Sequence, residues 1–393
     1  MPVTRRAAAR TTAITALSYS RIPGANERIG LGVIGTGGRG IHVMTKFQQF
    51  GDCEVRALCD VYARRLDEAQ AKAPGTRTFS RHEDLLASKE VDAVLIGTPD
   101  HWHAPIAIDA MNAGKDVFVE KPLCRTRAEA PEMVKAARVN GRICQVGLQQ
   151  RSGPIYLEPL EKYVRSGALG RITHIDAVWH SGPPRPLRRE PAGKPPNLDW
   201  ARFLGPVKYR EWDPAQYWNF RAFLDFNGGK MTDFGHHWLD AVHMYMGERA
   251  PHSVVFAGGI YYDLRDGRTA PDTCNALFEY DGFSVLFQSN AYGLPGEYGI
   301  TFHGDRGRLF VNRNRYVFSP AAKGASPEMK EIPGDITVDH VRNFLDCCRS
   351  RKRPNGDVGL AAISILPPLL ALESYLEKRR IRFDPDRLEV LPL

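Results

Sequence analysis

Short apolar runs alternate with helix-like segments along residues 27–150. Each run is almost continuously hydrophobic, which is typical of a strand buried on both faces of a parallel sheet. The runs lie at residues 27–35, 53–61, 91–99, 116–122 and 142–149. Because strands that alternate with helices form right-handed β-α-β units, the pattern predicts an α/β domain with a doubly wound parallel sheet.

Beyond residue 150 the pattern predicts a second, α+β domain over residues 151–393. Proline- and arginine-rich residues 180–197 predict a loop. Strand-like runs with hairpin signals between the later ones predict a predominantly antiparallel open sheet. These runs lie at residues 171–179, 252–264, 274–280, 284–290, 298–304 and 307–312. Helix-like segments close the chain at 339–351 and 359–379, and Pro367–Pro368 should kink or divide the second.

Composition narrows the choice of partners. A chain of 393 residues suits two domains, and contents of 43% hydrophobic and 25% charged residues are ordinary for a globular protein. No run approaches the roughly 18 consecutive apolar residues of a membrane span. The net charge of +8 comes mostly from scattered arginines without a nucleic-acid-binding motif. We therefore expect neither nucleic acid nor a membrane as a partner.

Residues 1–26 predict a leader. Twin arginines at Arg5 and Arg6 precede a weakly apolar stretch that Arg10 interrupts. A continuous hydrophobic region and an A-x-A cleavage site are not evident. A cytoplasmic location is favoured, and export by a twin-arginine signal stays an alternative.

A glycine-rich turn after the first apolar run predicts a dinucleotide site. Its sequence G-x-G-x-x-G is formed by Gly35, Thr36, Gly37, Gly38, Arg39 and Gly40. The spacing lets the backbone approach a pyrophosphate at a helix N-terminus. Asp60 closes the next run, where a carboxylate would bind the adenosine ribose and repel a 2′-phosphate. We predict NAD as the cofactor, and Arg64 and Arg65 keep NADP as an alternative.

Two further segments carry groups that can move protons. Glu120, Lys121 and Pro122 end the run at 116–122, and a lysine at this edge can stabilise a developing alkoxide. Pro122 can adopt a cis peptide bond, which would direct the lysine. At helical spacing, Asp233 and His237 share one face of residues 230–246.

A second set of polar residues in the same segment also suits a metal site at helical spacing. It consists of His236, Asp240 and His243. A zinc site requires at least three converging ligands, however, and the residues around His243 are apolar. We predict no metal, with Asp240 anchoring the helix and His243 in a structural role.

Several segments in combination resemble the Gfo/Idh/MocA oxidoreductases, the relatives of glucose–fructose oxidoreductase and inositol dehydrogenase. They are IGLGVIGTGGRG, TPDHWHAPIAIDAMNAGKDVFVEKPL, GLQQRS, GGKMTDFGHHWLD and HVRNFLDC. The resemblance implies a Rossmann domain over residues 27–150 and a substrate-binding domain over 151–393 whose open sheet forms homodimers or homotetramers. It also implies NAD(P)-dependent redox chemistry on sugars, polyols or their derivatives.

The resemblance also implies roles for individual residues. Lys121 matches the catalytic lysine of the EKP motif, and Asp233 and His237 match a D-x-x-x-H pair in which the histidine exchanges the proton. The residues that match the cofactor-covering loop and the nicotinamide end are Thr98, Pro99, His101, Trp102 and Gln149, together with Glu120. The chain departs from the family pattern at His236, so which of the two adjacent rings points inward stays open.

The substrate pocket is expected to use aromatic and basic residues. Aromatic rings stack on sugar faces, and arginines bind hydroxyl or carboxylate groups. The candidates are Arg151, Trp200, Tyr217, Arg221 and His236. A hydrophobic seam over the sheet is the alternative for the aromatic residues.

The predicted reaction is hydride transfer between NAD(P) and a hydroxyl or keto carbon of a sugar, polyol or glycoside. His237 would accept the hydroxyl proton, and Lys121 would stabilise the developing oxyanion. An NAD-dependent hydrolase or lyase, which oxidises the sugar transiently, would use the same residues. A sensor that binds the cofactor without catalysis is disfavoured, because Lys121, Asp233 and His237 are all present.

Overall fold

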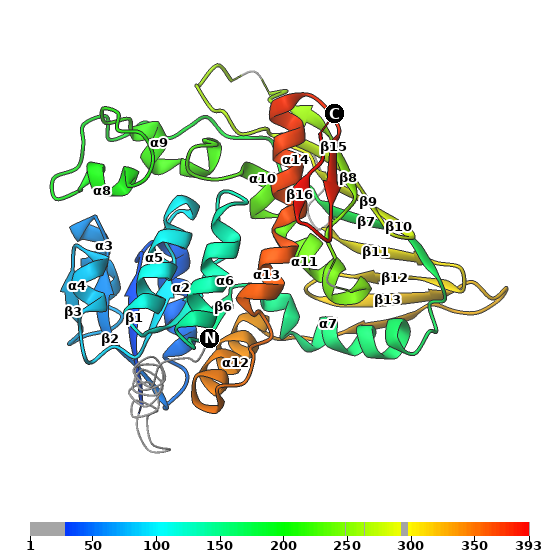
Figure 1. The fold of residues 1–393 in the computed structure, drawn as a ribbon, viewed down its shortest axis with the longest axis horizontal. Helices are drawn as coiled ribbons and strands as arrows, with labels where there is room; N and C mark the ends of the chain where they lie inside the picture. The colour runs from blue at the N-terminus through cyan, green and yellow to red at the C-terminus, as the bar shows by residue number, and fades with distance from the viewer. Residues whose placement is uncertain (1–27, 248, 263, 292–297, 393) are drawn as a thin grey trace, which may run out of the picture.

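Two sheets lie side by side and are joined by a column of helices from the end of the chain (Figure 1). The computed structural model describes residues 28–247, 249–262, 264–291 and 298–392. The leader predicted over residues 1–26 lies outside the described residues. The α/β class expected from the hydrophobic pattern is confirmed.

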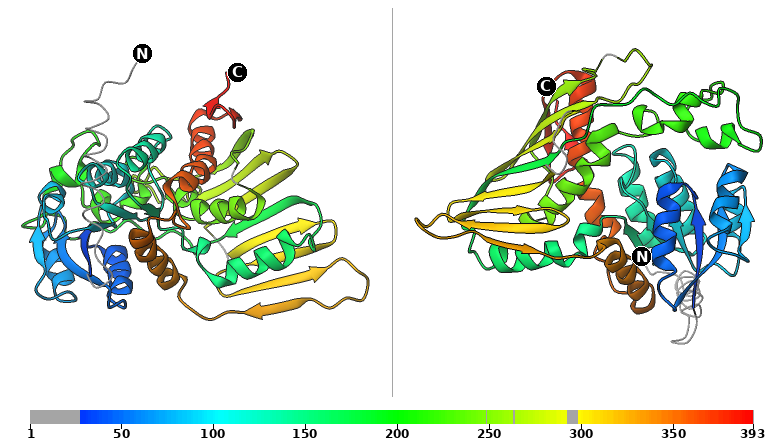
Figure 2. Two further views of the ribbon diagram at one scale, coloured as in Figure 1. Left: turned by 60° about the horizontal axis from the view of Figure 1, so that its bottom comes forward. Right: turned by 180° about the vertical axis from the view of Figure 1, so that it is seen from behind.

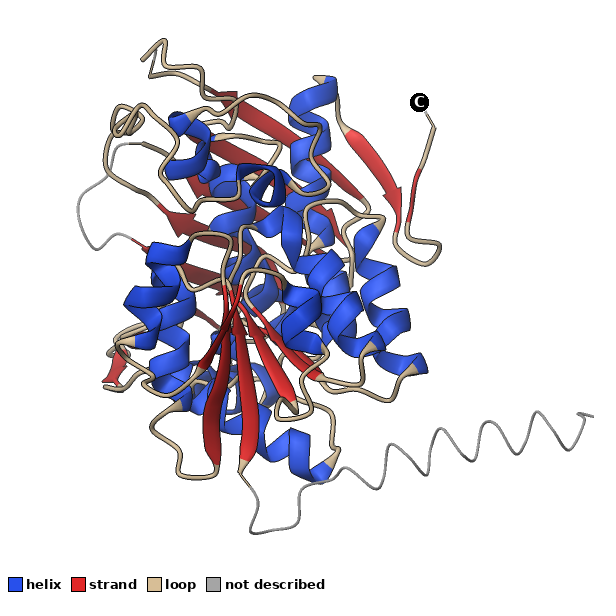
Figure 3. Ribbon diagram, turned by 90° about the vertical axis from the view of Figure 1, so that its left-hand side faces the viewer, coloured by secondary structure: helices blue, strands red, loops and turns tan. Residues whose placement is uncertain are grey.

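The first sheet is parallel, with strand order β3-β2-β1-β4-β5-β6. Its strands are β1 Ile29–Ile34, β2 Cys53–Cys59, β3 Arg77–Phe79, β4 Ala93–Ile96, β5 Asp116–Val119 and β6 Cys144–Val146. Helices cover both of its faces (Figure 3), and they are α2 Gly38–Phe47, α3 Ala63–Gln70, α4 His82–Leu86, α5 His103–Asn112 and α6 Glu129–Val139. Strand β3, which the hydrophobic pattern did not predict, is a three-residue edge strand whose side chains are largely exposed.

The second sheet has ten strands in the order β14-β13-β12-β11-β7-β10-β9-β8-β15-β16. Its pairs are antiparallel except for β7 with β10, which confirms a predominantly antiparallel sheet. The predicted strands are β7 Ile172–Trp179, β8 Ser253–Gly259, β9 Thr273–Tyr280, β10 Phe283–Ser289, β11 Tyr298–Gly304 and β12 Gly307–Val311. The additional strands are β13 Arg315–Pro320, β14 Glu328–Glu331, β15 Ile381–Asp384 and β16 Glu389–Val390.

Helices pack on one face of this second sheet, and the other face carries no helix among the described residues (Figure 2). The covering helices are α7 Pro154–Pro159, α11 Gly235–Met246 and α14 Leu366–Glu377. Their apolar side chains meet the inward residues of the strands, as where the ring of Tyr245 stacks on Phe302 at 4.7 Å. Burial of this apolar surface stabilises the sheet on its helical side.

Helices α12 Ile336–Ser350 and α13 Val358–Ser364 connect the second sheet to the first. The ring of Phe344 in α12 lies edge-on to Phe47 and Phe118 of the parallel-sheet domain, at 5.9 and 5.6 Å. Helices α13 and α14 are separated at Ile365, just before Pro367 and Pro368, as the proline pair predicts. The combined span Val358–Glu377 is long and apolar enough to cross a membrane, but 61% of its most apolar window is buried inside the protein, as in a core helix.

An aromatic segment from the second domain lies over one edge of the parallel sheet (Figure 1). It contains α8 Trp200–Leu204, α9 Pro214–Trp218 and the short helix η4 Phe220–Ala222. Its rings pack with one another and with Tyr62, and Leu198 forms an isolated bridge to Tyr62. The segment therefore forms one wall of the space above the strand ends.

We expect Phe344→Ala to destabilise the protein by about 3–5 kcal/mol, because it empties a fully buried site shared by both domains. Urea unfolding would measure the loss. Leu376→Ala, on the 62%-exposed side chain of α14, is the matched control and should change stability by no more than about 0.5 kcal/mol. A loss below about 1 kcal/mol for Phe344→Ala would show that α12 does not join the two domains.

Candidate functional site

A cavity of about 470 Å³ opens at the carboxyl ends of the parallel strands. The glycine turn and the ends of β2, β4 and β5 form one side. The aromatic segment and α10 Gly229–Asp233 form the other. The cavity lies where open α/β sheets bind ligands.

The glycine turn has the shape that a dinucleotide requires. Gly35 has a φ of +86°, and a Cβ atom there would lie 2.6 Å from the backbone nitrogen of Thr98. A Cβ on Gly40 would lie 1.9 Å from the carbonyl oxygen of Gly35, so the helix can pack closely on the turn only without a side chain. Gly37 and Gly38 line the cavity, and the backbone can approach a pyrophosphate there. These residues fit the predicted cofactor.

Asp60 supports the turn from the end of β2. Its Oδ2 accepts hydrogen bonds from the backbone nitrogen of Thr36, at 2.8 Å, and from its hydroxyl. Burial raises the pKa of Asp60, and the nearby charge of Arg65 opposes that shift. Arg65 also lies over the ring of Tyr217, 5.7 Å from its centre. Tyr217, predicted to bind substrate, therefore lies at the end of the cavity that suits the adenosine.

The loop after β4 connects the cavity to the aromatic segment. Thr98, Pro99 and Trp102 line the cavity, and the indole nitrogen of Trp102 donates to the carbonyl oxygens of Arg202 and Phe203. His101 does not line the cavity, because its ring is packed among aromatic side chains and its Nε2 lies 2.8 Å from the same Phe203 oxygen. In the structure, His101 anchors the wall through its contact with Phe203.

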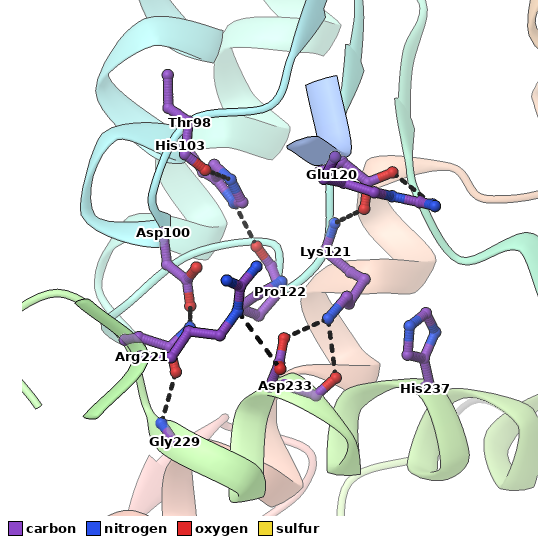
Figure 4. A network of polar contacts seen from close by, with 12 residues as sticks. Thr98, Asp100, His103, Glu120, Lys121, Pro122, Arg221, Gly229, Asp233 and His237 are labelled. Atoms are coloured by element: carbon purple, nitrogen blue, oxygen red, sulfur yellow. Dashed lines mark hydrogen bonds and ion pairs between the residues drawn. The ribbon is translucent and has the colours of Figure 1, made fainter. Parts of the chain in front are cut away.

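Lys121 joins the two domains inside the cavity (Figure 4). Its Nζ donates to the Oδ1 of Asp233 at 2.5 Å and to the Asp233 carbonyl oxygen at 2.9 Å. The Nε of Arg221 lies 3.5 Å from the other carboxylate oxygen of Asp233. Burial acts to raise the pKa of Asp233, but the Lys121 and Arg221 charges outweigh it and hold the pKa below its ordinary value. The Lys121–Pro122 peptide bond is cis.

His237 lies beside Lys121 at the start of α11 (Figure 4). Its Nδ1 lies 3.1 Å from the Oε1 of Gln150, an acceptor that places the proton on Nδ1 and leaves the Nε2 lone pair available. Burial, followed by the charges of Arg313 and Lys121, lowers the pKa of His237 well below 6.5. The imidazole is therefore neutral near pH 7 and can accept a proton.

The adjacent ring of His236 points elsewhere. Its Nε2 lies 3.3 Å from the hydroxyl of Ser364 on α13, and the residue is fully buried. The segment 230–246 is not one continuous helix, because α10 ends at Asp233 and α11 begins at Gly235. Figure 4 shows His237 beside Lys121, and the charge of Lys121 also contributes to the lowered pKa of His236, so both rings lie near the lysine. His236, predicted to bind substrate, has its Nε2 directed at Ser364.

His236, Asp240 and His243, whose spacing would suit a metal site, each contact a different residue in the structure. The carboxylate of Asp240 is fully buried and accepts from the guanidinium of Arg151 at 2.8–2.9 Å. The Nε2 of His243 lies 3.0 Å from the hydroxyl of Tyr280. No three His, Cys, Asp or Glu side chains in the described part of the chain converge as metal ligands. Arg151, predicted to bind substrate, is instead held by the buried carboxylate, which requires a cationic partner.

Two other predicted contacts lie behind the cavity surface. Trp200 is packed against Phe203 at 5.2 Å, and its indole nitrogen donates to the carbonyl oxygen of Arg210. This places Trp200 in the hydrophobic seam that was the alternative. Gln149 is buried beside the site and does not line the cavity. Glu120 lines the cavity and pairs with Arg39 at 2.8 Å.

Asp100 is a site residue that the sequence did not single out. It lines the cavity, and its carboxylate accepts from the amide of Asn227 at 2.7 Å. Burial raises the pKa of Asp100 to about 6. Asp100 lies between two residues predicted to cover the cofactor, Pro99 and His101, and that position was its only signal.

Comparison with protein families matches nearly the whole described chain. Residues 29–148 match an oxidoreductase family with an NAD-binding Rossmann fold, and residues 158–391 match the C-terminal alpha/beta domain of that family, GFO_IDH_MocA. A glycosyl hydrolase family 109 protein 1 from Shewanella sp. (strain ANA-3) is 32% identical over 162 residues, which are 39% of this chain and 35% of that relative. An alpha-N-acetylgalactosaminidase from Shewanella oneidensis matches equally well over the same shares. The match thus spans about a third of the length of these relatives.

Solved structures share the fold over more than nine tenths of the chain. Levoglucosan dehydrogenase in complex with NADH and levoglucosan has a TM-score of 0.72 at 17% identity, covering 91% of this chain and 99% of that one. The WlbA dehydrogenase from Bordetella pertussis, in complex with NADH and UDP-GlcNAcA, has a TM-score of 0.69 at 22% identity, covering 93% and 100%. At these identities the likeness shows the fold. The family match establishes the NAD-binding domain that the glycine fingerprint predicts.

We expect Gly35→Ala to weaken NAD binding by about tenfold or more, because a side chain at positive φ is strained and would press on the Thr98 backbone. Fluorescence titration with NADH would measure the affinity. Gly51→Ala is the matched control, since a Cβ at Gly51 meets no atom within 4 Å and the residue does not line the cavity. Equal affinities in the two variants would contradict the assignment of the turn.

Proposed function

Because the chain belongs to the Gfo/Idh/MocA oxidoreductase family, we propose that it transfers a hydride between NAD and a hydroxyl or keto carbon of a sugar, a polyol or a glycoside. The observation that carries the proposal is the meeting of Lys121, Asp233 and His237 next to the cavity that fits the cofactor (Figure 4). A neutral base beside a cation that a carboxylate holds in place is what oxidation of an alcohol needs, and the protonated base serves the reverse reaction.

The protein residues divide the proton chemistry between them. NAD, when bound, accepts or returns the hydride. His237 is neutral and presents Nε2 as the acceptor for the hydroxyl proton, while Gln150 holds the opposite ring nitrogen. The ammonium group of Lys121, held by Asp233, stabilises negative charge on the substrate oxygen. Arg221, at the open side of the same carboxylate, keeps Asp233 ionised.

A redox-neutral glycosidase is the second candidate, favoured by the match to the glycosyl hydrolase family 109 relatives at 32% identity. The two candidates differ in product. Incubation of the protein with NAD and a panel of free sugars, polyols and aryl glycosides distinguishes them. Net NADH absorbance supports the dehydrogenase, and release of the aglycone without net NADH supports the glycosidase.

We expect His237→Asn to reduce turnover by about 10²–10⁴-fold while NAD affinity is unchanged, because the variant removes the proton acceptor and no cofactor contact. Steady-state kinetics and NADH titration measure the two quantities. His236→Asn is the neighbouring comparison and should lose much less activity, since its ring faces Ser364. A larger loss in His236→Asn would show that the other ring carries the proton.

The pH dependence of kcat/KM should reflect the ionisation of Asp100 and not that of His237. A base acts in its unprotonated form, so the strongly lowered pKa of His237 keeps it active throughout pH 6.5–8. Asp100, with a pKa of about 6, changes the charge of the cavity on protonation as the pH falls through 6. We expect kcat/KM for oxidation to be level above about pH 7 and to show an inflection near pH 6 that Asp100→Asn removes. Persistence of that inflection in Asp100→Asn would assign it to another group.

A further inference from the structure

Arg313 carries two buried donors that no described residue accepts. It lies in the turn between β12 and β13, and its guanidinium lies over the indole of Trp179, 4.9 Å from the ring centre. Its Nε and Nη2 are shielded from solvent and lack a hydrogen-bond partner. Asn312 fixes the turn, because its side-chain oxygen accepts from the backbone nitrogens of Asn314 and Arg315. Buried donors normally have partners, so these two point to a bound acceptor.

The two nitrogens form one edge of the guanidinium fork. In other arginines of the same protein, the corresponding pair of nitrogens binds a carboxylate. In Arg268 the Nε and Nη2 donate to the two oxygens of Asp266, at 2.9 and 2.6 Å, and in Arg151 the same atoms contact Asp240. A guanidinium placed over the face of an indole can still use its N–H groups for such a bidentate contact. The geometry of Arg313 therefore suits a planar carboxylate.

Arg313 lies at the end of the site where His237 acts. The His237 ring is nearly parallel to Trp179, at 26° and 6.0 Å, so both residues contact the same indole. After burial, the Arg313 charge is the largest cause of the lowered pKa of His237. The charges of Arg39 and Glu120, which line the cavity, in turn act on Arg313. Arg313 thus lies close to the proton acceptor, and neither residue is among those that line the cavity.

The charges of this region leave Arg313 without a counter-ion. Arg39 pairs with Glu120 at 2.8 Å, and Lys121 pairs with Asp233 at 2.5 Å. No carboxylate of the described chain lies within ion-pair distance of Arg313. The hydroxyl of Tyr156 is a further buried donor without a partner, and the Arg313 charge acts on it. Burial raises the pKa of Tyr156, so the hydroxyl keeps its proton and can donate alongside the arginine.

We propose that the Nε–Nη2 edge of Arg313, with the Tyr156 hydroxyl, binds a carboxylate on the substrate, so that the substrate is a carboxylated sugar of the uronic acid type. This inference rests on the proposed function, which supplies a sugar as the substrate, and adds that the sugar carries a carboxylate. The carboxylate accepts from Arg313 while a ring hydroxyl of the same molecule reaches Nε2 of His237. The neutral counterpart of the substrate would leave the buried guanidinium unpaired, which gives discrimination against it.

The test compares D-glucuronate with D-glucose, and D-galacturonate with D-galactose, by calorimetric titration of the NAD-loaded protein. Each uronate should bind more tightly than its neutral partner. Arg313→Gln should weaken uronate binding by about 10- to 100-fold, leave NAD affinity unchanged and remove the preference. Arg313→Lys should restore it only in part, since an ammonium lacks the fork. Arg308→Gln, at an exposed arginine of the adjacent strand β12, is the matched control and should bind like the wild type.

The outcomes separate this inference from the proposed function. Equal binding of uronates and neutral sugars, absence of uronate binding, or tighter binding of glucose 6-phosphate than of glucuronate overturns the carboxylate subsite. Loss of NAD affinity in Arg313→Gln also overturns it. NADH formation from neutral sugars with kinetics unchanged in Arg313→Gln overturns the subsite and leaves hydride transfer standing. Arg313-dependent uronate binding without NADH formation supports the subsite and refutes the dehydrogenase.

Thermal unfolding gives a further readout. If Arg313 has a purely structural role, Arg313→Gln should have a lower Tm than the wild type; if Arg313 binds a ligand, the Tm of the unliganded protein should not fall.

Discussion

The ion pair between Lys121 and Asp233 is the contact on which the arrangement of the site depends. Lys121 follows a strand of the parallel sheet, and Asp233 ends a helix of the second domain, so the pair closes the cavity between them. Both groups are largely shielded from water, where a charge without a partner is strongly unfavourable. The two domains therefore have to meet with these side chains opposed, and His237 is placed beside the lysine by the same meeting.

A second buried pair supports the first from behind. Arg151 and Asp240 link the segment that carries Gln150 to the helix that carries His237, and the Ser364 hydroxyl donates to the same carboxylate at 2.7 Å. Gln150 can then face the histidine ring and determine which nitrogen keeps the proton. The polar cluster of residues 230–246 thus works as a set of separate contacts, each with a partner from another part of the chain.

Much of the fold follows from local patterns. Buried strands of the parallel sheet are continuous apolar runs, and the glycine turn is required by a φ and by close approaches that only glycine permits. Strands β3 and β14 could not be predicted from such patterns, because edge strands expose most of their side chains and carry little hydrophobic signal. The position of Arg313 near the site could not be predicted either, since in the sequence it is one arginine in a hairpin turn and only the indole of Trp179 beside it distinguishes it.

The sequence by itself determined the two sheets, the cofactor turn, the lysine at the strand end and the histidine–aspartate segment, because each depends on residues near one another in the chain. Only the tertiary structure decided which polar side chains face the cavity. Arg151 and His236 have the chemistry of substrate contacts, but partners far away in sequence, Asp240 and Ser364, hold them elsewhere. Trp200 packs within the aromatic segment, and Tyr217 lines the cavity at the end that suits the adenosine. A buried charge or donor takes the direction of its nearest partner, and that partner is known only once the chain has folded.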